Sequence, residues 1–393
     1  MKIVFLAPFG IRPKGTVIAR MLPLAGELLK LGHDVVIVAP PYTNPEDSGK
    51  TETVRGVRLV NITLPNLGKA LGALPMAWRM FRAAVKEKPD ILHLYKPKGY
   101  GGLAAMLLIC CARLGLRIPR LFLDTDDWEG KGGMNDLVDY STAEKYLFAF
   151  QEQWLPPRMI GVTVASRMLE DAVLRMGLGR EQVFYLPNCV DDLPPGNGQK
   201  IRERLGIAPE APVLILYTRF FEFSQEKLYD VFAKIFGRVP EVRFLVVGKG
   251  RYKEEEQLIA AGREHGFADA LVMAGWVESQ EILDYLAAGD VAIYPFADTL
   301  VNRAKCPAKL TELLRSRVPV VADAVGQICE YIEPEVSGIL CAPDNWQDMV
   351  DRTVELLQDS ELRLSLGDAG RRHLLDRFNW RQFADQLCGF YKQ

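Results

Sequence analysis

Short runs of β-branched and aliphatic residues alternate with longer segments of helical periodicity along the whole chain. Parallel sheets wrapped by helices have this pattern, which therefore predicts an α/β fold with doubly wound sheets. A helix over Val17–Leu31 follows the first strand and ends at Gly32, a residue suited to a helix C-cap. The strands predicted in the first half are Ile3–Ala7, Val35–Ala39, Val57–Ile62, Ile91–Tyr95, Arg120–Asp124, Ile160–Val164 and Val183–Leu186.

A stretch rich in proline and glycine, Asp191–Gly198, interrupts this pattern near the middle of the chain. Such residues oppose both helix and strand, so we expect a domain boundary here, with an N-terminal domain over 1–192 and a C-terminal domain over 193–377. Two doubly wound domains imply a cleft, because ligands of such sheets bind at the carboxyl ends of the strands. The strands predicted beyond the boundary are Val213–Tyr217, Arg243–Val247, Ala270–Met273, Val291–Tyr294 and Val318–Ala322.

Composition narrows the class of protein only a little. The formal net charge of −2 gives no sign of a nucleic-acid partner. Residues 1–190 hold 24 Lys and Arg against 18 Asp and Glu, so the first half is basic. This charge could serve a phosphorylated acceptor or peripheral contact with an anionic membrane, but such an asymmetry also arises by chance. Seven cysteines without a C-x-x-C pair indicate reduced thiols and a cytoplasmic protein. The longest apolar stretch, Leu103–Ala112, has about half the length that spans a bilayer.

Two strand ends in the first half carry candidate chemistry. A basic, glycine-containing loop over 9–16 opens into the first helix, where Gly15 and Thr16 can approach an anion or a sugar hydroxyl, although a plain turn explains the loop equally well. The acidic turn over 124–130 follows a buried strand and includes Asp126 and Asp127. Carboxylates this close need solvent, hydrogen bonds or cations, which favours a functional site over an exposed turn. Asp124-Thr125-Asp126 also matches a D-x-D metal motif, an alternative that we rank low.

In the second half, Arg219 ends a strand and Lys227 begins the next helix, so the two cations could stabilise a diphosphate leaving group. The segment Cys306–Ala322 predicts a helix with proline at its start, an acidic residue one turn later and a buried strand immediately afterwards. Glu312 in this helix can accept hydrogen bonds from both hydroxyls of a ribose. The alternative is that Glu312 merely lies on the solvent-exposed face of the helix.

These residues, together with Gly275-Trp276-Val277-Glu278, Tyr285, Pro295, Gly326, Glu330, Gly338 and Pro343, occur in an order and spacing that resembles the retaining GT-B glycosyltransferases, in particular glycosyltransferase family 4. The resemblance implies two Rossmann-like domains, with the donor nucleotide on the second and a last helix, about 378–393, that packs back on the first. It also implies that Trp276 and Val277 hold the base, that Glu312 holds the ribose, and that Arg219 and Lys227 carry the diphosphate.

The predicted donor site also includes Gly15, Thr16, Lys305, Lys309, Leu310 and Thr311. The family commonly has a further glutamate seven residues before the one matching Glu312, and this chain has Ala304 there. Asn302, Arg303 or Lys305 could replace that contact, so the identity of the donor sugar is open. Many family members also carry a histidine where this chain has Asp126 or Asp127, which we therefore expect near the donor sugar.

We expect an acceptor region in the N-terminal domain that includes His93, placed at the end of a strand, together with Lys96, Asp126 and Trp128, although a lone histidine on a strand is more often structural. Residues 74–88 combine apolar and basic side chains and suit either a helix at a membrane interface or a packed surface helix. Asp126, Asp127, Arg219 and Lys227 are the predicted catalytic residues, and no metal or other cofactor is expected.

The function predicted from the sequence is transfer of a hexosyl-type sugar from a nucleotide-sugar to an acceptor hydroxyl, with retention by resemblance. A UDP-sugar is the favoured donor, with GDP- or ADP-sugar as alternatives, and the acceptor is unknown. If Asp126 or Asp127 acts as a general base, inversion is expected instead. The rival functions are a nucleotide-sugar epimerase or hydrolase and a catalytically silent subunit that binds nucleotide for a partner glycosyltransferase.

Overall fold

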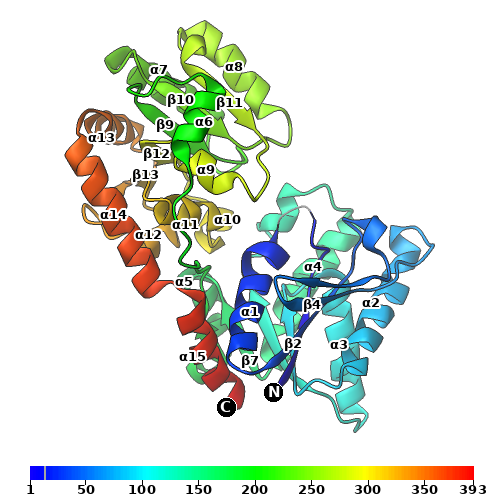
Figure 1. Cartoon of the computed structure of the whole chain (residues 1–393). Coiled ribbons are helices and arrows are strands. Elements are labelled where there is room, and N and C mark those ends of the chain that lie inside the picture. Colours follow the sequence, from blue (N-terminus) through cyan, green and yellow to red (C-terminus); the bar gives the residue numbers. More distant parts are fainter. Residues whose placement is uncertain (13–14) are drawn as a thin grey trace. The chain divides into compact units, whose positions relative to one another are not determined.

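The computed structural model describes residues 1–12 and 15–393 and divides into two compact units (Figure 1). The first unit comprises Met1–Asn188, Ala304–Cys306 and Trp380–Gln393, and the second comprises Cys189–Arg303 and Pro307–Asn379. Each unit contains one sheet with helices packed against it, so the α/β prediction is confirmed. Among the described residues, no helix is both long enough and apolar enough to cross a bilayer.

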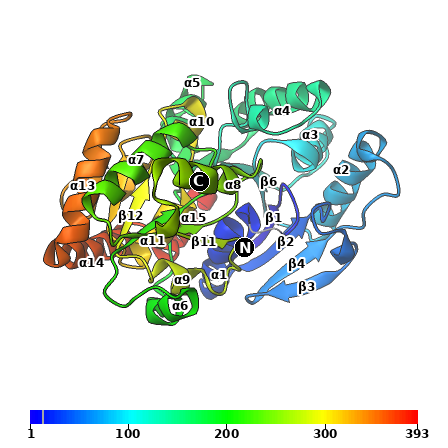
Figure 2. The ribbon, with the colours of Figure 1, turned by 90° about the horizontal axis from the view of Figure 1, so that it is seen from above.

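The first unit is built on an eight-stranded sheet in the order β3-β4-β2-β1-β5-β6-β7-β8. All neighbouring strands are parallel except β3, which pairs antiparallel with β4 at the sheet edge (Figure 2). The strands are β1 (Lys2–Leu6), β2 (Asp34–Ala39), β3 (Thr51–Val54), β4 (Val57–Asn61), β5 (Ile91–Tyr95), β6 (Arg120–Thr125), β7 (Gly161–Val164) and β8 (Val183–Tyr185). β5 is buried along its whole length, as expected for a central strand covered on both faces.

Helices cover both faces of this sheet. α2 and α3 lie side by side, and α15 packs against α1. The helix predicted over Val17–Leu31 divides into a π-helical turn, η1, and a regular helix, α1. The helices are η1 (Val17–Met21), α1 (Leu22–Lys30), α2 (Lys69–Lys86), α3 (Gly99–Arg113), α4 (Thr142–Trp154), α5 (Arg167–Arg175) and α15 (Trp380–Lys392), with short 3₁₀ turns η2 (Pro45–Asp47), η3 (Met134–Leu137), η4 (Pro156–Arg158) and η5 (Arg180–Gln182).

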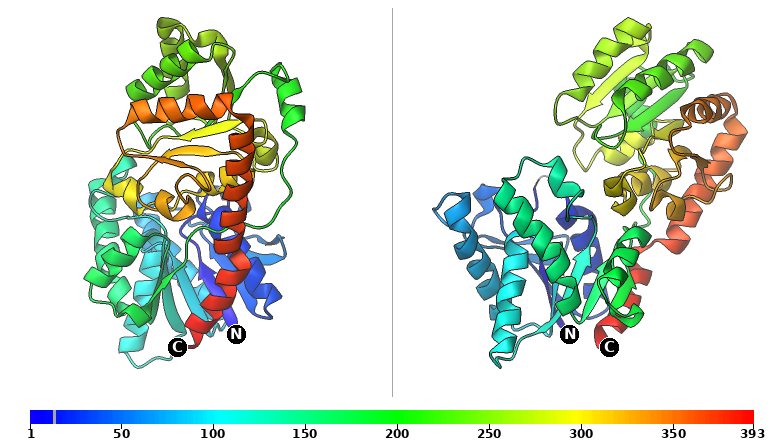
Figure 3. Two further views of the ribbon diagram at one scale, coloured as in Figure 1. Left: turned by 90° about the vertical axis from the view of Figure 1, so that its left-hand side faces the viewer. Right: turned by 180° about the vertical axis from the view of Figure 1, so that it is seen from behind.

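The second unit has a six-stranded parallel sheet in the order β11-β10-β9-β12-β13-β14. Its core includes the stacked rings of Phe232 and Phe244, with centroids 4.2 Å apart. α13 packs against β12, β13 and β14 (Figure 3). The strands are β9 (Val213–Tyr217), β10 (Arg243–Val247), β11 (Leu271–Gly275), β12 (Val291–Tyr294), β13 (Val320–Asp323) and β14 (Ile339–Cys341). The helices are α6 (Gly198–Leu205), α7 (Gln225–Arg238), α8 (Glu254–His265), η6 (Ala268–Ala270), α9 (Ile282–Leu286), α10 (Leu300–Ala304), α11 (Ala308–Arg315), α12 (Ile328–Tyr331), α13 (Trp346–Gln358) and α14 (Ser360–Arg377).

Candidate active site

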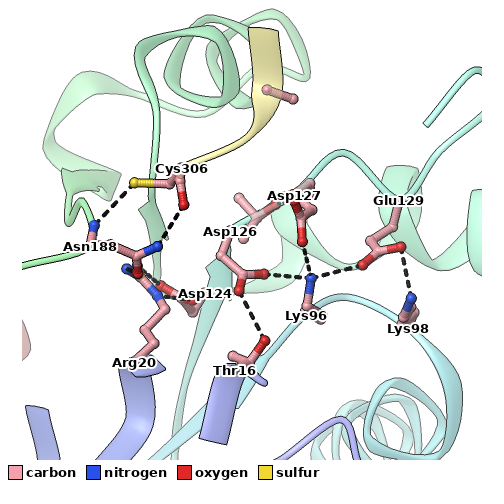
Figure 4. A network of polar contacts seen from close by, with 12 residues as sticks. Thr16, Arg20, Lys96, Lys98, Asp124, Asp126, Asp127, Glu129, Asn188 and Cys306 are labelled. Atoms are coloured by element: carbon pink, nitrogen blue, oxygen red, sulfur yellow. Dashed lines mark hydrogen bonds and ion pairs between the residues drawn. The ribbon is translucent and has the colours of Figure 1, made fainter. Parts of the chain in front are cut away.

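The acidic turn after β6 surrounds one buried lysine. Lys96, directly after β5, places its Nζ atom 2.8 Å from Asp126 Oδ1, 2.6 Å from Asp127 Oδ2 and 3.0 Å from Glu129 Oε1 (Figure 4). β5 and β6 are parallel neighbours, so their carboxyl ends meet at one edge of the sheet. The backbone of Lys96 has φ of 62°, a left-handed conformation that is uncommon outside glycine. Of the solvent, hydrogen bonds or cations that these carboxylates were expected to need, Lys96 supplies a cation.

Burial and charge oppose each other in this cluster. Burial on its own lowers the pKa of Lys96, but the carboxylates of Asp126, Asp127 and Glu129 outweigh it and raise the pKa well above the ordinary value. Burial raises the pKa of Asp126, yet the charge of Lys96 outweighs it, and the net pKa is lowered. For Asp127 burial wins over Lys96, and the pKa is raised. Lys96 is thus held as a cation, and the two aspartates differ in basicity.

Glu129 links this cluster to a second layer of buried polar groups. It accepts from Lys98 Nζ at 2.8 Å, and Lys98 also donates to Asn135 Oδ1 at 3.0 Å. Glu152 on α4 accepts from the backbone N–H of Glu129 at 3.1 Å. Burial, reinforced by the charge of Glu129, raises the pKa of Glu152 to about 8. Glu152 is therefore a neutral carboxylic acid at pH 7 inside a network of charged groups.

The loop between β1 and η1 reaches the same cluster. Thr16 Oγ1 donates to Asp126 Oδ2 at 3.2 Å, and Gly15 accepts the backbone N–H of Ala19 at 2.9 Å. Thr16, predicted for the donor site, thus lies beside Asp126 within the first unit. The sequence prediction of a basic loop over 9–16 also included Pro13 and Lys14, which lie outside the described residues.

Asp124, the first residue of the D-x-D alternative, is bound to arginine. Arg20 on η1 donates to both carboxylate oxygens, from Nε at 2.8 Å and from Nη2 at 2.6 Å. Arg20 also donates to the carbonyl of Leu186 at 2.6 Å and to Asn188 Oδ1 at 3.2 Å. Both members of this ion pair are fully buried. A bidentate guanidinium occupies the lone pairs that a metal would need, and among the described residues no group of His, Cys, Asp and Glu is arranged to hold a metal ion.

Two residues predicted for the acceptor region differ in exposure. His93 lies in the middle of β5, not at its end, and its fully buried ring shares a hydrogen bond of 2.6 Å with the Tyr391 hydroxyl. Burial and the charge of Arg20 lower the pKa of His93 to about 3, so the ring is neutral. This correction of its position favours the structural interpretation of His93. Trp128 is only partly buried, and its Nε1 donates to the carbonyl of Lys131 at 3.1 Å.

In the second unit, Tyr217 at the end of β9 connects the predicted donor residues. Its hydroxyl donates to Glu312 Oε2 at 3.0 Å, and the Nζ atom of Lys309 lies 4.6 Å from the centre of its ring. Burial raises the pKa of Tyr217 well above its ordinary value; Glu312 adds to this and the nearby charge of Arg219 opposes it. Glu312, Lys309 and Arg219 therefore gather around one tyrosine at the carboxyl end of a central strand. Tyr217 and Lys309 also line a small pocket there.

Lys227, the second predicted diphosphate ligand, is held in an exposed ion pair. Its Nζ atom is 2.6 Å from Asp344 Oδ1 and 5.7 Å from the ring centre of Trp346. An exposed pair of this kind contributes about 0–1 kcal/mol, so a diphosphate could displace Asp344 at little cost. The structure places Lys227 at the start of α7, as predicted.

The other predicted donor residues differ in how far their side chains are exposed to solvent. Trp276 follows β11 with 55% of its surface exposed, as a base-stacking residue requires, and Val277 beside it is half-buried. Leu310 is completely buried in the core, and its backbone N–H donates to the carbonyl of Pro307. Thr311 is buried, and its hydroxyl donates to the Ala308 carbonyl at 2.9 Å. The side chains of Leu310 and Thr311 thus pack within the second unit, and their assignment to the donor site stays a prediction.

Ala304 and Lys305 group with the first unit, although the sequence places them in the C-terminal domain. Ala304 is fully buried, and its carbonyl accepts from Ser166 Oγ at 2.7 Å. The position where the family commonly has a glutamate therefore holds a small core side chain. Lys305 is also buried.

Sequence reasoning missed three residues of these polar clusters, Glu129 and Glu152 in the first unit and Tyr217 in the second. Glu129 lies in the predicted acidic turn but was given no role. The available signal was that Glu129 follows one predicted strand while Lys96 and Lys98 follow the strand before it in the sequence. Tyr217, as the last residue of a predicted strand, had the same kind of signal. Glu152 gave none, because an acid in an amphipathic helix is ordinarily solvated.

Two α/β units with parallel sheets and polar clusters at their strand ends define the fold class of the GT-B glycosyltransferases. The family models agree with it. A glycosyl transferase 4-like domain matches residues 15–189, and the glycosyl transferases group 1 domain matches residues 197–373. Together they cover most of the chain, which belongs to the glycosyltransferases of family 4.

Two relatives illustrate the range of this similarity. The sulfoquinovosyl transferase SQD2 of Arabidopsis thaliana is 22% identical over 377 residues, a match that covers 90% of this chain and 66% of the relative. The D-inositol 3-phosphate glycosyltransferase of Xylanimonas cellulosilytica is 28% identical over 238 residues, 57% of this chain and 54% of the relative. The matches thus span about half to two thirds of the length of these relatives.

Solved structures show the same fold over the whole chain. Sucrose-phosphate synthase from Thermosynechococcus elongatus has a TM-score of 0.77 at 18% identity and covers 100% of this chain and 98% of its own. HepE from Anabaena, in complex with UDP and glucose, has a TM-score of 0.74 at 18% identity and covers 100% and 99%. The predicted GT-B fold is therefore confirmed.

Proposed function

We propose that this chain transfers a hexosyl group from a nucleoside diphosphate sugar to an acceptor hydroxyl. The observation that carries the proposal is the cluster at the end of β9, where Glu312, Lys309 and Arg219 surround Tyr217. A carboxylate beside two cations suits a molecule that carries ribose hydroxyls next to a diphosphate. Membership in a glycosyltransferase family supports the same reaction.

The donor that we favour is a UDP-sugar. Glu312 accepts the hydroxyls of the ribose, and Arg219 and Lys227 neutralise the diphosphate. Trp276 offers an exposed ring on which the base stacks. The HepE structures contain UDP or UDP-glucose, which is a precedent for a UDP-sugar on this fold. GDP-sugar and ADP-sugar remain alternatives for the experiment below.

During transfer, the acceptor oxygen forms a bond to the anomeric carbon while the bond from that carbon to the diphosphate oxygen breaks. The electron pair leaves with the diphosphate, where Arg219 and Lys227 stabilise the added charge. The proton of the acceptor hydroxyl passes to an oxygen of the departing diphosphate, a route that gives retention. Asp126 is ill suited to take the proton itself, because the charge of Lys96 and the hydrogen bond from Thr16 lower its pKa, although each oxygen can still accept a further hydrogen bond.

The acceptor hydroxyl binds at the carboxyl edge of the first sheet, where Asp126, Asp127 and Trp128 follow β6. In this proposal the aspartates are hydrogen-bond acceptors that orient hydroxyl groups, and Lys96 holds them in place. A nucleotide-sugar hydrolase or epimerase would have no use for such an acceptor site. A silent subunit would use only the second unit, and Ala304 remains the one observation that favours it.

Peripheral contact with a membrane is part of the proposal. α2 buries Met76, Met80 and Ala84 in the core, but Leu71, Leu74 and Trp78 are 51–76% exposed on its other side. Val85 continues this exposed stripe, and basic residues accompany it, with Arg79, Arg82 and Lys86 on the helix and Lys88 just after its end. An exposed apolar stripe flanked by cations suits the surface of an anionic bilayer. Vesicle flotation of the wild type and of a Leu71→Ser/Trp78→Ser variant tests this contact.

A thermal-shift panel of UDP, GDP, ADP and their sugars tests the donor site. A ligand that binds only the folded chain raises the melting temperature by mass action, so the matching donor gives the largest increase. Glu312→Ala and Arg219→Ala are expected to reduce that increase by at least half. The matched controls are Glu264→Ala and Arg263→Ala, exposed residues of α8 that keep the full increase.

Full ligand stabilisation in both Glu312→Ala and Arg219→Ala contradicts the assigned donor site. Turnover with an acceptor identifies a transferase, whereas release of free sugar at the same rate without any acceptor identifies a hydrolase. NMR of the anomeric proton in the first product distinguishes retention from inversion. An inverted product would assign the general base to Asp127, whose pKa is raised by burial.

A further inference from the structure

A pocket lies in the first unit near the amino-terminal end of β6, whereas the acidic turn follows the carboxyl end of the same strand. It has a volume of about 420 Å³ and is formed by the end of α3, the start of β6, η4 and the residue before β7. Small-molecule sites range from about 300 to 1,000 Å³, so the pocket holds more than a bare inorganic ion. Because β6 is six residues long, its start lies roughly 20 Å from the acidic turn at its other end. The pocket is thus separate from the proposed acceptor site.

Three arginines line this pocket, namely Arg113, Arg120 and Arg158. The guanidinium of Arg158 lies 4.1 Å from the ring centre of Trp154 and donates to the Trp154 carbonyl at 2.7 Å. Arg113 lies 6.0 Å from the same ring, and Arg120 lies 5.5 Å from the ring of Phe122 and donates to the Tyr391 carbonyl. Aromatic rings and carbonyls therefore position these guanidinium groups and leave most of their five N–H donors for a ligand.

No carboxylate neutralises the three arginines within the part of the chain that the structure describes. The segments that form the pocket, 91–123 and 153–169, contain no Asp or Glu. The preceding acid, Asp90, accepts a hydrogen bond of 2.7 Å from the backbone N–H of Lys2. Arginines that gather without counter-charge repel one another, and an anion relieves this repulsion. The pocket is therefore complementary to a negatively charged group.

Part of the pocket lining is apolar. Ile109, Ile118, Leu121 and Ile160 line it beside the arginines, and Ile160 is 45% exposed. A single exposed isoleucine is common on protein surfaces. Four aliphatic side chains next to three arginines, however, form a surface with an apolar part and a cationic part. A ligand that fills it carries an anionic group and an adjoining hydrocarbon part.

We propose that this pocket binds an amphipathic phosphate, in which a phosphate ester contacts Arg113, Arg120 and Arg158 and the attached hydrocarbon lies on the isoleucines. Arginine binds phosphate with two parallel hydrogen bonds, which explains why arginines rather than lysines line the pocket. The ligand is either the headgroup region of an anionic lipid or a soluble phosphate ester. The proposal does not depend on the donor site, which lies in the second unit.

Isothermal titration of the full chain with monomeric octyl phosphate tests the proposal. Inorganic phosphate and uncharged octyl glucoside are the reference probes, and octyl phosphate is expected to bind at least tenfold more tightly than either. Arg113→Gln/Arg158→Gln is expected to weaken octyl phosphate binding at least tenfold. The control Arg175→Gln/Arg180→Gln removes the same charge from two exposed arginines elsewhere in the first unit and keeps wild-type affinity.

Equal affinity of both double variants overturns the proposal, as does equal affinity for octyl phosphate and inorganic phosphate. The single variant Ile160→Ser gives an independent measurement, because it leaves the arginines in place and weakens octyl phosphate binding alone. Vesicles of phosphatidylcholine with phosphatidic acid identify the source. Weaker flotation of Arg113→Gln/Arg158→Gln than of the wild type assigns a lipid, and equal flotation of the two assigns a soluble ester, because contact through α2 is the same in both. Donor-induced thermal shifts of the same variants stay at the wild-type value, so failure here is separable from failure of the proposed function.

Discussion

Lys96 is the central cation of the first unit's polar cluster, because three carboxylates contact its buried ammonium group. Removing one partner of a buried ion pair leaves the other charges without compensation, which costs more than the pair contributes when intact. The left-handed backbone at Lys96 indicates that the surrounding structure holds the residue in place.

Lys96→Met is therefore expected to lower the free energy of unfolding by about 3–5 kcal/mol at pH 7.5. Lys96 holds the pKa values of Asp126 and Glu129 below their ordinary values, and without it burial raises them. These carboxylates then bind protons in the folded chain, so the loss becomes smaller as the pH falls towards 5. Urea unfolding at the two pH values measures the difference. A loss that is equal at both would contradict the role of charge.

Glu152 gives the opposite pH dependence. Its folded pKa of about 8 exceeds the ordinary value of 4.5, so its neutral form stabilises the fold fully below pH 4.5. That contribution decreases as the pH rises to about 8, by at most about 1.4 kcal/mol per pH unit. Glu152→Gln keeps an acceptor for the Glu129 N–H without titrating, so its stability relative to wild type increases from pH 5 to pH 8. Unfolding curves of Glu152→Gln and of the exposed control Glu264→Gln measure this trend, and parallel curves for wild type and Glu152→Gln would refute it.

At the scale of elements, η1 brings Arg20 to the ends of two strands, β6 and β8. A π-helical turn often occurs at functional sites, and here it directs a fully buried guanidinium towards Asp124 near the end of β6 and the Leu186 carbonyl after β8. Thr163 on β7 also donates to Asp124. One arginine thus links the carboxyl ends of β6 and β8, which lie on either side of β7, and the acidic turn follows β6.

Arg20→Met is expected to destabilise the first unit by about 3–5 kcal/mol, because Asp124 becomes a buried charge without a partner. The double variant Arg20→Met/Asp124→Leu removes both charges and should recover at least half of that loss. A double-mutant cycle by chemical denaturation gives the coupling between the two residues. Additive losses would show that the ion pair is not the source of the effect.

The pattern of the sequence predicted most strands, because buried parallel strands are continuous apolar runs. It did not predict β3, whose residues Thr51–Val54 alternate between exposed and half-buried positions. Arg55 and Gly56, both with positive φ, form the two-residue turn to β4, and this turn was the signal available. The ion pairs around Lys96 and Arg20 could not be predicted, because they depend on which strand ends meet and on which charges become buried.

At the scale of the whole molecule, the last helix belongs to the first unit although the chain reaches it from the second. α15 buries Trp380, Leu387, Phe390 and Tyr391 in that unit, and the Tyr391 hydroxyl bonds to His93. Each large side chain buried here contributes about 1.5–3 kcal/mol. Their sum is comparable with the 5–15 kcal/mol that stabilises a typical domain.

Deleting residues 380–393 is therefore expected to unfold the first unit. Because the helix makes up none of the second unit, donor-induced stabilisation of the remaining folded unit should persist. Differential scanning calorimetry with and without UDP-sugar follows the two units separately. A single unfolding transition with wild-type enthalpy in the truncated chain would show that α15 is dispensable.

The position of α15 also constrains how the protein is made. Residues 1–188 leave the ribosome first, yet Tyr391 and its neighbours on the helix emerge about two hundred residues later. Throughout that interval the nascent first unit lacks one of its covering helices and exposes apolar surface on which Phe390 and Tyr391 later pack. The second unit, by contrast, is complete once residue 379 has emerged, so the half of the chain that is synthesised first is the last to acquire its native structure.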